Sequence, residues 1–179
     1  MRLSPVTALS LPLLLVASVD PMIGAGEPRR GPQSALINAA GQSIGTVEMW
    51  ETPGGISFRI NASGLPPGIH GLHVHTTGRC DPPGFTTAGA HWNPAGRQHG
   101  FENPAGPHAG DLRNVTVAGN GVLQETVALP GVSYHQLFDA GPGADGAALV
   151  LHAAPDDLRT DPSGNSGARI ACSVLGPVQ

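Results

Sequence analysis

The sequence predicts an all-β protein, an eight-stranded antiparallel Greek-key barrel or sandwich with two long ordered loops. Three observations lead to this prediction. Glycine and proline are abundant, at 26 and 18 of 179 residues, which suits turns and irregular loops. Short segments alternate apolar with polar residues, the period of a half-buried strand. No long segment repeats apolar residues at helical spacing, and short strands separated by turn residues are typical of antiparallel sandwiches and barrels.

The chain is long enough for one domain and short for two, and it divides into three parts. Arg2 precedes an apolar run from Ala8 to Val19, which is short for a bilayer span and lies where a secretory leader has its apolar core. We therefore expect residues 1–26 to be a signal peptide with an approximate cleavage point; an uncleaved anchor is the alternative. Residues 27–34 are polar and rich in glycine and proline and are expected to be a flexible arm. Residues 35–179 form the predicted domain.

The first predicted strands are Ala35 to Ala40 and Ser43 to Glu51, joined at Gly41-Gln42. Apolar residues recur along both segments, as in strands with a buried face. Pro53-Gly54-Gly55 is a predicted turn, because glycine and proline supply the backbone angles that turns need. Ile56 to Asn61 then alternates apolar with polar residues, which predicts a half-buried antiparallel strand.

The next predicted strand, Ile69 to His75, carries His73 and His75. Residues two apart on a strand point to the same face, about 6–7 Å apart, so these two imidazoles can converge on one ion if the strand bends or twists. No strand pattern follows between Thr76 and Gly110. Loops of this length are uncommon in compact domains unless they are functional, and a bound metal would order such a loop.

The remaining predicted strands lie in the second half of the chain. Asn114 to Ala118 and Val122 to Leu129 form an expected hairpin. Ala147 to His152 and Ala168 to Leu175 are the last two strands, and Pro155 to Gly167 between them is a second long polar loop.

Five histidines and one aspartate are spaced like the ligands of two adjacent metal sites. Neutral imidazole is the commonest metal ligand in proteins, and scattered core histidines would not cluster in this way. His135 fits no ligand position and is expected to be a surface or loop residue. The clustered residues are His73, His75, His91, His99, His108 and Asp111.

The charge pattern offers no nucleic-acid or membrane surface. The formal net charge is −4, and all nine basic residues are arginines. No basic patch suggests nucleic acid, and no basic amphipathic stretch suggests a lipid surface. We expect neither a nucleic-acid partner nor a membrane span in the mature form.

The two cysteines, Cys80 and Cys172, lie far apart in the chain. In an exported protein an even number of cysteines favours a disulfide. Two buried free thiols, or one thiol that binds metal, are the alternatives.

Four motifs together are specific for one family. They are Gly71-Leu72-His73-Val74-His75, Ala88-Gly89-Ala90-His91-Trp92-Asn93-Pro94, His108-Ala109-Gly110-Asp111-Leu112, and Gly164-Asn165-Ser166-Gly167-Ala168-Arg169-Ile170-Ala171-Cys172. With these motifs the chain resembles the copper,zinc superoxide dismutases of the secreted bacterial kind, over roughly Gly64 to Gly176.

The resemblance implies roles for individual residues. The implied copper ligands are His73, His75, His91 and His152, and the implied zinc ligands are His91, His99, His108 and Asp111. His91 would therefore bridge both metals. The family's disulfide corresponds to Cys80 and Cys172, and the arginine at the mouth of its active channel corresponds to Arg169. Asp156 corresponds to the carboxylate that links copper and zinc ligands in the family, and His70 corresponds to a structural histidine.

General chemistry supports these implied roles. Three histidines and a carboxylate form the closed tetrahedral set that holds structural zinc, whereas four imidazoles suit copper(II). Arg169 keeps its proton and presents a planar fork of donors to a small anion. Asp156 can accept the second N–H of ligand histidines and so fix their tautomers.

The function that the resemblance implies is dismutation of superoxide to dioxygen and hydrogen peroxide, with copper and zinc as cofactors and with Arg169 and His91 as catalytic residues. The implied location is periplasmic or secreted, and the role is antioxidant defence. A homodimer and a monomer both stay open, because bacterial members do not share one subunit interface. Two other classes are kept as alternatives: a non-catalytic copper and zinc carrier, and a structural domain with zinc alone, which would not need His73, His75 and His152.

Overall fold

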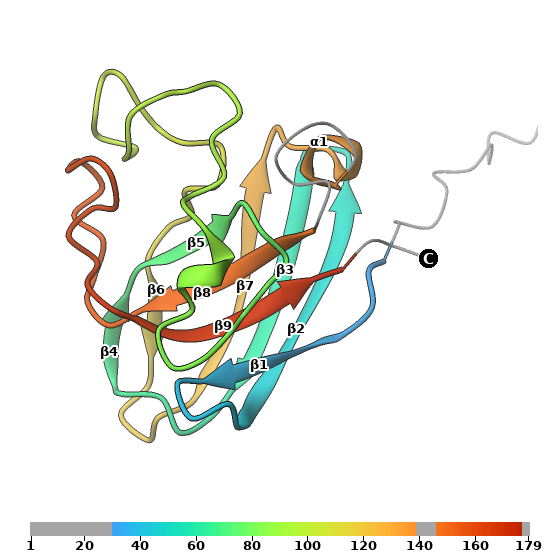
Figure 1. The fold of residues 1–179 in the computed structure, drawn as a ribbon, viewed down its shortest axis with the longest axis vertical. Coiled ribbons are helices and arrows are strands. Elements are labelled where there is room, and N and C mark those ends of the chain that lie inside the picture. The colour runs from blue at the N-terminus through green and yellow to red at the C-terminus, as the bar shows by residue number, and fades with distance from the viewer. Residues whose placement is uncertain (1–29, 139–145, 177–179) are drawn as a thin grey trace, which may run out of the picture.

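The computed structural model describes residues 30–138 and 146–176, which form a strongly curled antiparallel sheet with two long loops on one side (Figure 1). Nine strands occur in this part of the chain. They are β1 (Ser34–Asn38), β2 (Ser43–Thr52), β3 (Gly55–Ala62), β4 (Gly68–His70), β5 (Leu72–His75), β6 (Val115–Val117), β7 (Leu123–Pro130), β8 (Ala147–His152) and β9 (Arg169–Leu175).

Seven strands form one sheet in the order β5-β8-β9-β1-β2-β3-β7, and β4 pairs with β6 in a small second sheet. Every pairing of these strands is antiparallel. Strands from opposite ends of the domain meet where β1 pairs with β9, with Ile37 opposite Cys172. The all-β antiparallel prediction is confirmed, and the non-sequential strand order is of the kind that Greek-key connections produce.

The predicted strand from Ile69 to His75 is interrupted at Gly71, which gives nine strands in the described residues in place of the expected eight. The Gly71 N–H donates to Ala154 O, and Gly71 O accepts the His152 N–H. A Cβ at Gly71 would lie 2.9 Å from the Ser166 side chain, closer than side chains pack, so only glycine fits here. The interruption fastens the loop after β8 to the strand that carries His73 and His75.

Two short helical segments were not predicted. They are η1 (Thr86–Ala88), a single 3₁₀ turn, and α1 (Tyr134–Phe138), which has five residues. A helix of one or two turns is too short for its apolar period to show in a sequence.

The apolar core lies inside the curled sheet. Ile56, Phe58 and Ile60 of β3 point inward and are almost fully buried, as their alternation with polar residues predicts. Strand β8 differs, since all six of its residues are buried. Its outward residues, Ala148 and Val150, pack in a second apolar cluster with Phe85, Ala88 and Cys172 from outside the strand. Strand β8 is therefore covered on both faces, which explains its nearly continuous apolar sequence.

The predicted N-terminal segments lie only partly within the described residues. The predicted signal peptide, residues 1–26, lies outside the described residues. Residues 30–33 of the predicted arm lie beside the sheet, where Arg30 bridges to Trp50 and the Gly31 N–H donates to Met49 O, and Ser34 already belongs to β1. Within the described ranges, no helix has the length and apolar character needed to cross a membrane.

Cys80 and Cys172 are joined in a disulfide, with their Cα atoms 5.7 Å apart, so the predicted pairing is confirmed. The bond fastens the loop after β5 to Cys172, a fully buried residue of β9. The two cysteines are 92 residues apart in the chain, and a cross-link that closes a long loop restricts the unfolded chain strongly.

We expect replacement of both cysteines by serine to lower the free energy of unfolding by about 2–5 kcal/mol, because the unfolded chain regains the freedom that the cross-link removes. Urea unfolding of the metal-free chain, followed by circular dichroism, measures the change. A loss below about 1 kcal/mol would contradict this expectation.

Candidate metal centre

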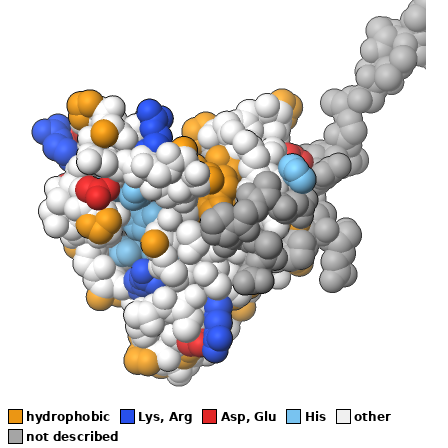
Figure 2. Space-filling model, turned by 45° about the horizontal axis from the view of Figure 1, so that its top comes forward, with side chains coloured by type: hydrophobic (Ala, Val, Ile, Leu, Met, Phe, Trp, Pro, Cys, Tyr) orange, Lys and Arg blue, Asp and Glu red, His pale blue; other side chains and the backbone are white. Residues whose placement is uncertain are grey.

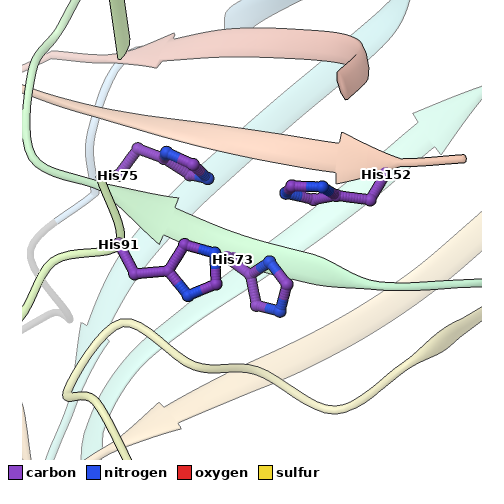
Figure 3. A group of neighbouring side chains, drawn as sticks. All are labelled: His73, His75, His91 and His152. Carbon is purple, nitrogen blue, oxygen red and sulfur yellow. The ribbon is translucent and has the colours of Figure 1, made fainter. Parts of the chain in front are cut away.

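The edge strand β5 and the loop after it bring the predicted ligands together. His73 and His75 point from β5, opposite Val150 and Ala148 of β8, and His152 ends β8. Isolated bridges then pair β5 with the loop, with His75 opposite His91 and His73 opposite Asp111. Figure 3 shows the rings of His73, His75, His91 and His152 around one common space.

Four ring nitrogens in this group are buried and have no hydrogen-bond partner among the described residues. The ligand atoms of the four histidines lie within 4.8 Å of one another. A buried polar atom without a partner costs about 1–3 kcal/mol, so four together indicate a site that binds a ligand. The unpaired atoms are His73 Nδ1, His75 Nε2, His91 Nε2 and His152 Nε2.

The opposite nitrogens of three of these rings fix where the protons are. His75 Nδ1 lies 2.9 Å from Gly89 O, and His152 Nδ1 lies 3.2 Å from Gly167 O. A carbonyl only accepts, so each Nδ1 donates its proton and each Nε2 keeps a free lone pair. His73 Nε2 in the same way donates to Asp156 Oδ2 at 2.8 Å, which leaves His73 Nδ1 free. The lone pairs are thus turned toward one place, as a set of copper ligands requires.

A second group surrounds one oxygen of Asp111. Asp111 Oδ1 lies 2.9 Å from His91 Nδ1, 3.0 Å from His99 Nδ1 and 3.2 Å from His108 Nδ1. The Nδ1 atoms of His91 and His108 are 3.4 Å apart. Ligand atoms around a tetrahedral ion about 2.0 Å away lie about 3.3 Å from one another. These spacings therefore fit a structural zinc site with three nitrogens and one oxygen.

His73 also lies near the second group, since its nearest ligand atom is within 4.8 Å of those of His91, His99 and Asp111. Proximity alone would make His73 a fourth member in place of His108. However, His73 Nε2 is already bound to Asp156, and its Nδ1 belongs with the first group. His108 Nδ1 lies 3.2 Å from Asp111 Oδ1, so we assign His108 to the zinc set.

Asp156 links the two groups. Its carboxylate accepts from His73 Nε2 at 2.8 Å and lies 3.0 Å from His99 Nε2. Asn114 holds the backbone of Asp156, because its amide donates to Asp156 O and accepts the Asp156 N–H, both at 2.8 Å. Gly164 packs against the same carboxylate so closely that a Cβ there would overlap it. The sequence predicts Asp156 but not the roles of Asn114 and Gly164, which become evident only when the loops are folded together.

Arg169 lies at the start of β9, half-buried, with its guanidinium held in place. It donates to Phe85 O and to Gly89 O, both at 2.7 Å. These acceptors belong to the loop that the disulfide fastens, and Gly89 O also orients His75. The position of the charge therefore depends on the same segment that orients His75, a predicted copper ligand. Figure 2 shows that histidine side chains are visible from outside in a hollow of this face, with basic side chains nearby.

Burial keeps the first group of histidines neutral. It lowers the pKa of His75 to about 2, of His152 to about 3 and of His91 to about 4. Neighbouring positive charges lower these pKa values further, whereas hydrogen bonds raise them. His99 differs: burial alone would lower its pKa, but hydrogen bonds to Asp111 and Asp156 outweigh burial and raise it to about 9. The same contacts hold the carboxyl pKa of Asp111 and of Asp156 below the ordinary range, against the effect of burial.

The remaining histidines lie outside both groups. His135 is on α1. His70 is buried on β4, with Nδ1 2.7 Å from His152 O and Nε2 2.8 Å from Pro66 O. It thus holds the backbone of His152, a predicted copper ligand.

Comparisons with known proteins show which proteins this chain is similar to. Residues 43–175 match the family model "Copper/zinc superoxide dismutase (SODC)". "Superoxide dismutase [Cu-Zn] 2" of Aquifex aeolicus is 42% identical over 180 residues, covering 97% of this chain and 98% of that protein. A crystal structure of a SOD-like protein from Bacillus subtilis has a TM-score of 0.76 and 38% identity over 82% of this chain and 99% of that one. The Cu/Zn superoxide dismutase from Brucella abortus has a TM-score of 0.66 and 30% identity, with the same coverage.

The lowered pKa values predict that the metal-free chain loses stability in mild acid. Unfolded, His75, His91 and His152 regain a pKa of about 6.5, so below that pH the unfolded state binds more protons than the folded one. The free energy of unfolding then falls as the pH drops from about 6.5 toward 4. His99 acts in the opposite sense, but one raised group does not offset three lowered ones.

Calorimetry in a chelator at about pH 7.5 and about pH 5 measures this effect as a lower Tm at the acid pH. An equal or higher Tm at the acid pH would show that burial does not keep these rings neutral.

Proposed function

Because the chain belongs to the copper/zinc superoxide dismutase family, an oxidoreductase family with copper and zinc as cofactors, we propose that it dismutes superoxide at a copper ion bound by His73, His75, His91 and His152. The observation that carries the proposal is the set of four unpaired buried nitrogens that face one space. A domain that used zinc alone would have no reason to bury three further imidazoles with free lone pairs.

We propose that His91 is shared between the two metals. Its Nδ1 lies in the group around Asp111, whereas its Nε2 belongs to the unpaired set. A ring held from the zinc side stays in place when Nε2 is free to carry a proton. His91 can therefore take up a proton at Nε2 in one half of the cycle and give it to the reduced substrate in the other.

Copper, when bound, supplies the one-electron chemistry by which one superoxide is oxidised to dioxygen and a second is reduced. The reduced product needs two protons to leave as hydrogen peroxide, one from His91 Nε2 and one from solvent. Arg169 attracts the anion and orients it, since two of its donors are fixed on Phe85 O and Gly89 O and the rest of the fork stays available. Asp156 keeps His73 and His99 in their ligand tautomers.

We also propose that the protein works outside the cytoplasm, in the periplasm or as a secreted protein. The Cys80–Cys172 disulfide suits an oxidising compartment, and the apolar run from Ala8 to Val19 suits export. Fractionation of cells that make the full chain or a chain without residues 1–26 tests this: only the full chain should leave the cytoplasm.

The function is tested by stopped-flow measurement of superoxide decay with the copper- and zinc-loaded protein. We expect rapid catalytic decay, and we expect His152→Ala to reduce it to the level of the copper-free chain, because copper loses one of its ligands. Metal analysis of both proteins accompanies the kinetics. Full copper occupancy with decay no faster than in buffer would instead favour a non-catalytic copper carrier.

A second prediction concerns Arg169. We expect Arg169→Glu to slow the reaction at low salt by roughly 10-fold or more, since the local field is reversed, while both metals stay bound. The difference should shrink as salt screens the charge. Arg113→Glu makes the same charge change at an exposed residue beside Phe101 and should have a small effect. An unchanged rate for Arg169→Glu at low salt would refute the role.

A further inference from the structure

Asp161 lies in the loop between β8 and β9, five residues beyond Asp156, and it approaches the zinc set from a different side. Its Oδ1 accepts the backbone N–H of His99 at 2.6 Å. The same oxygen lies 3.8 Å from His108 Nε2. One carboxylate oxygen thus faces two of the proposed zinc ligands, in each case away from the Nδ1 that would bind the ion.

We propose that Asp161 is a positioning residue for the zinc ligands. It acts on the backbone of His99 and on the ring of His108. The inference rests on the zinc assignment made above. Nothing in the ligand pattern assigns it this role, because Asp161 itself stays out of the group around Asp111.

The backbone of the loop shows why such a residue is needed. The Gly100 N–H and the His108 N–H both donate to Asp111 Oδ2, at 3.0 and 2.9 Å. Asp111 therefore fixes two points of the loop as well as providing a ligand oxygen. The N–H of His99 points elsewhere and is fixed by Asp161. Without Asp161, the backbone at His99 would lose a short, charge-assisted hydrogen bond.

The ring of His108 gives Asp161 its second contact. When His108 binds zinc through Nδ1, its proton is on Nε2, which faces Asp161. A carboxylate hydrogen-bonded to such an imidazole makes it a better ligand and fixes its orientation; at 3.8 Å, Asp161 acts on this ring through its charge alone. Asp161 is 47% exposed and lines a hollow of about 430 Å³ together with His91, His108 and Arg97. Solvent weakens the contact at 3.8 Å, so the bond to the His99 backbone carries more of the effect.

The two long loops also pack together around Asp161. The Glu102 N–H donates to Leu158 O at 2.8 Å, and Arg159 pairs with Glu102 at 2.6 Å. Figure 1 shows the loop after β5 and the loop after β8 on the same side of the sheet. The loop after β8 thereby contacts the proposed zinc ligands at two places, Asp156 and Asp161.

Zinc release from the copper-free, zinc-loaded full chain tests the proposal, with the chelating dye 4-(2-pyridylazo)resorcinol as acceptor. We expect Asp161→Ala to release zinc roughly 10- to 100-fold faster than the parent chain. Asp161→Asn keeps an oxygen acceptor but loses the charge, so its rate should lie between the two. Circular dichroism before the assay verifies that each variant is folded.

Asp157→Ala is the matched control. Asp157 is an exposed aspartate in the same loop, and its carboxylate accepts from Arg159 N, Thr160 N and the Asn165 amide, all within that loop. It contacts no proposed ligand, so its loss should leave zinc release near the parent rate.

Binding of cobalt(II) in place of zinc adds a measurement, the visible absorption of the bound ion, that a change in loop stability alone would not alter. We expect Asp161→Ala to change the visible absorption bands of bound cobalt, because two ligands shift, and Asp157→Ala to leave them unchanged. Release from Asp161→Ala within about twofold of the parent, or faster release with unchanged cobalt bands, would overturn the positioning role. A parent chain that binds neither zinc nor cobalt would instead overturn the zinc assignment itself.

Discussion

The imidazole of His91 faces two groups of ligand atoms at once, and the arrangement of the surrounding loops depends on it. One nitrogen lies 2.9 Å from Asp111 Oδ1, and the other is unpaired among the nitrogens of His73, His75 and His152. This placement requires a loop residue to lie beside the edge strand β5, which the bridge between His75 and His91 provides. Strands β5 and β8 provide His73, His75 and His152, and residues of the loop complete both groups.

Holding so many imidazoles together is costly for the metal-free chain. Burial without hydrogen-bond partners is unfavourable, and the depressed pKa values of His75, His91 and His152 are one expression of that cost. The covalent link between Cys80 and Cys172 and the contacts of the loop after β8 offset part of it. Metal binding would then supply the remaining stabilisation, as it does where ligands are prearranged in loops.

Much of this arrangement was predictable from the sequence, and the limits of the prediction have physical causes. The strands follow from alternation, as in β3, whose apolar residues face the core. The ligand types follow from histidine spacing combined with the family's motifs. The break at Gly71 and the roles of Asn114, Gly164 and Asp161 were not predictable, because each depends on contact between loops far apart in the chain. A sequence pattern reports local periodicity, whereas these contacts arise only after the sheet has curled.

The central claim is that His91 is bound by both metals. A crystal structure of the copper- and zinc-loaded protein, with anomalous scattering recorded at the absorption edge of each metal, tests this most directly. We expect a zinc peak about 2.0–2.1 Å from His91 Nδ1, among His99, His108 and Asp111, and a separate copper peak next to His91 Nε2, among His73, His75 and His152. A copper peak that His91 does not contact, or a single metal shared by all these residues, would contradict the account.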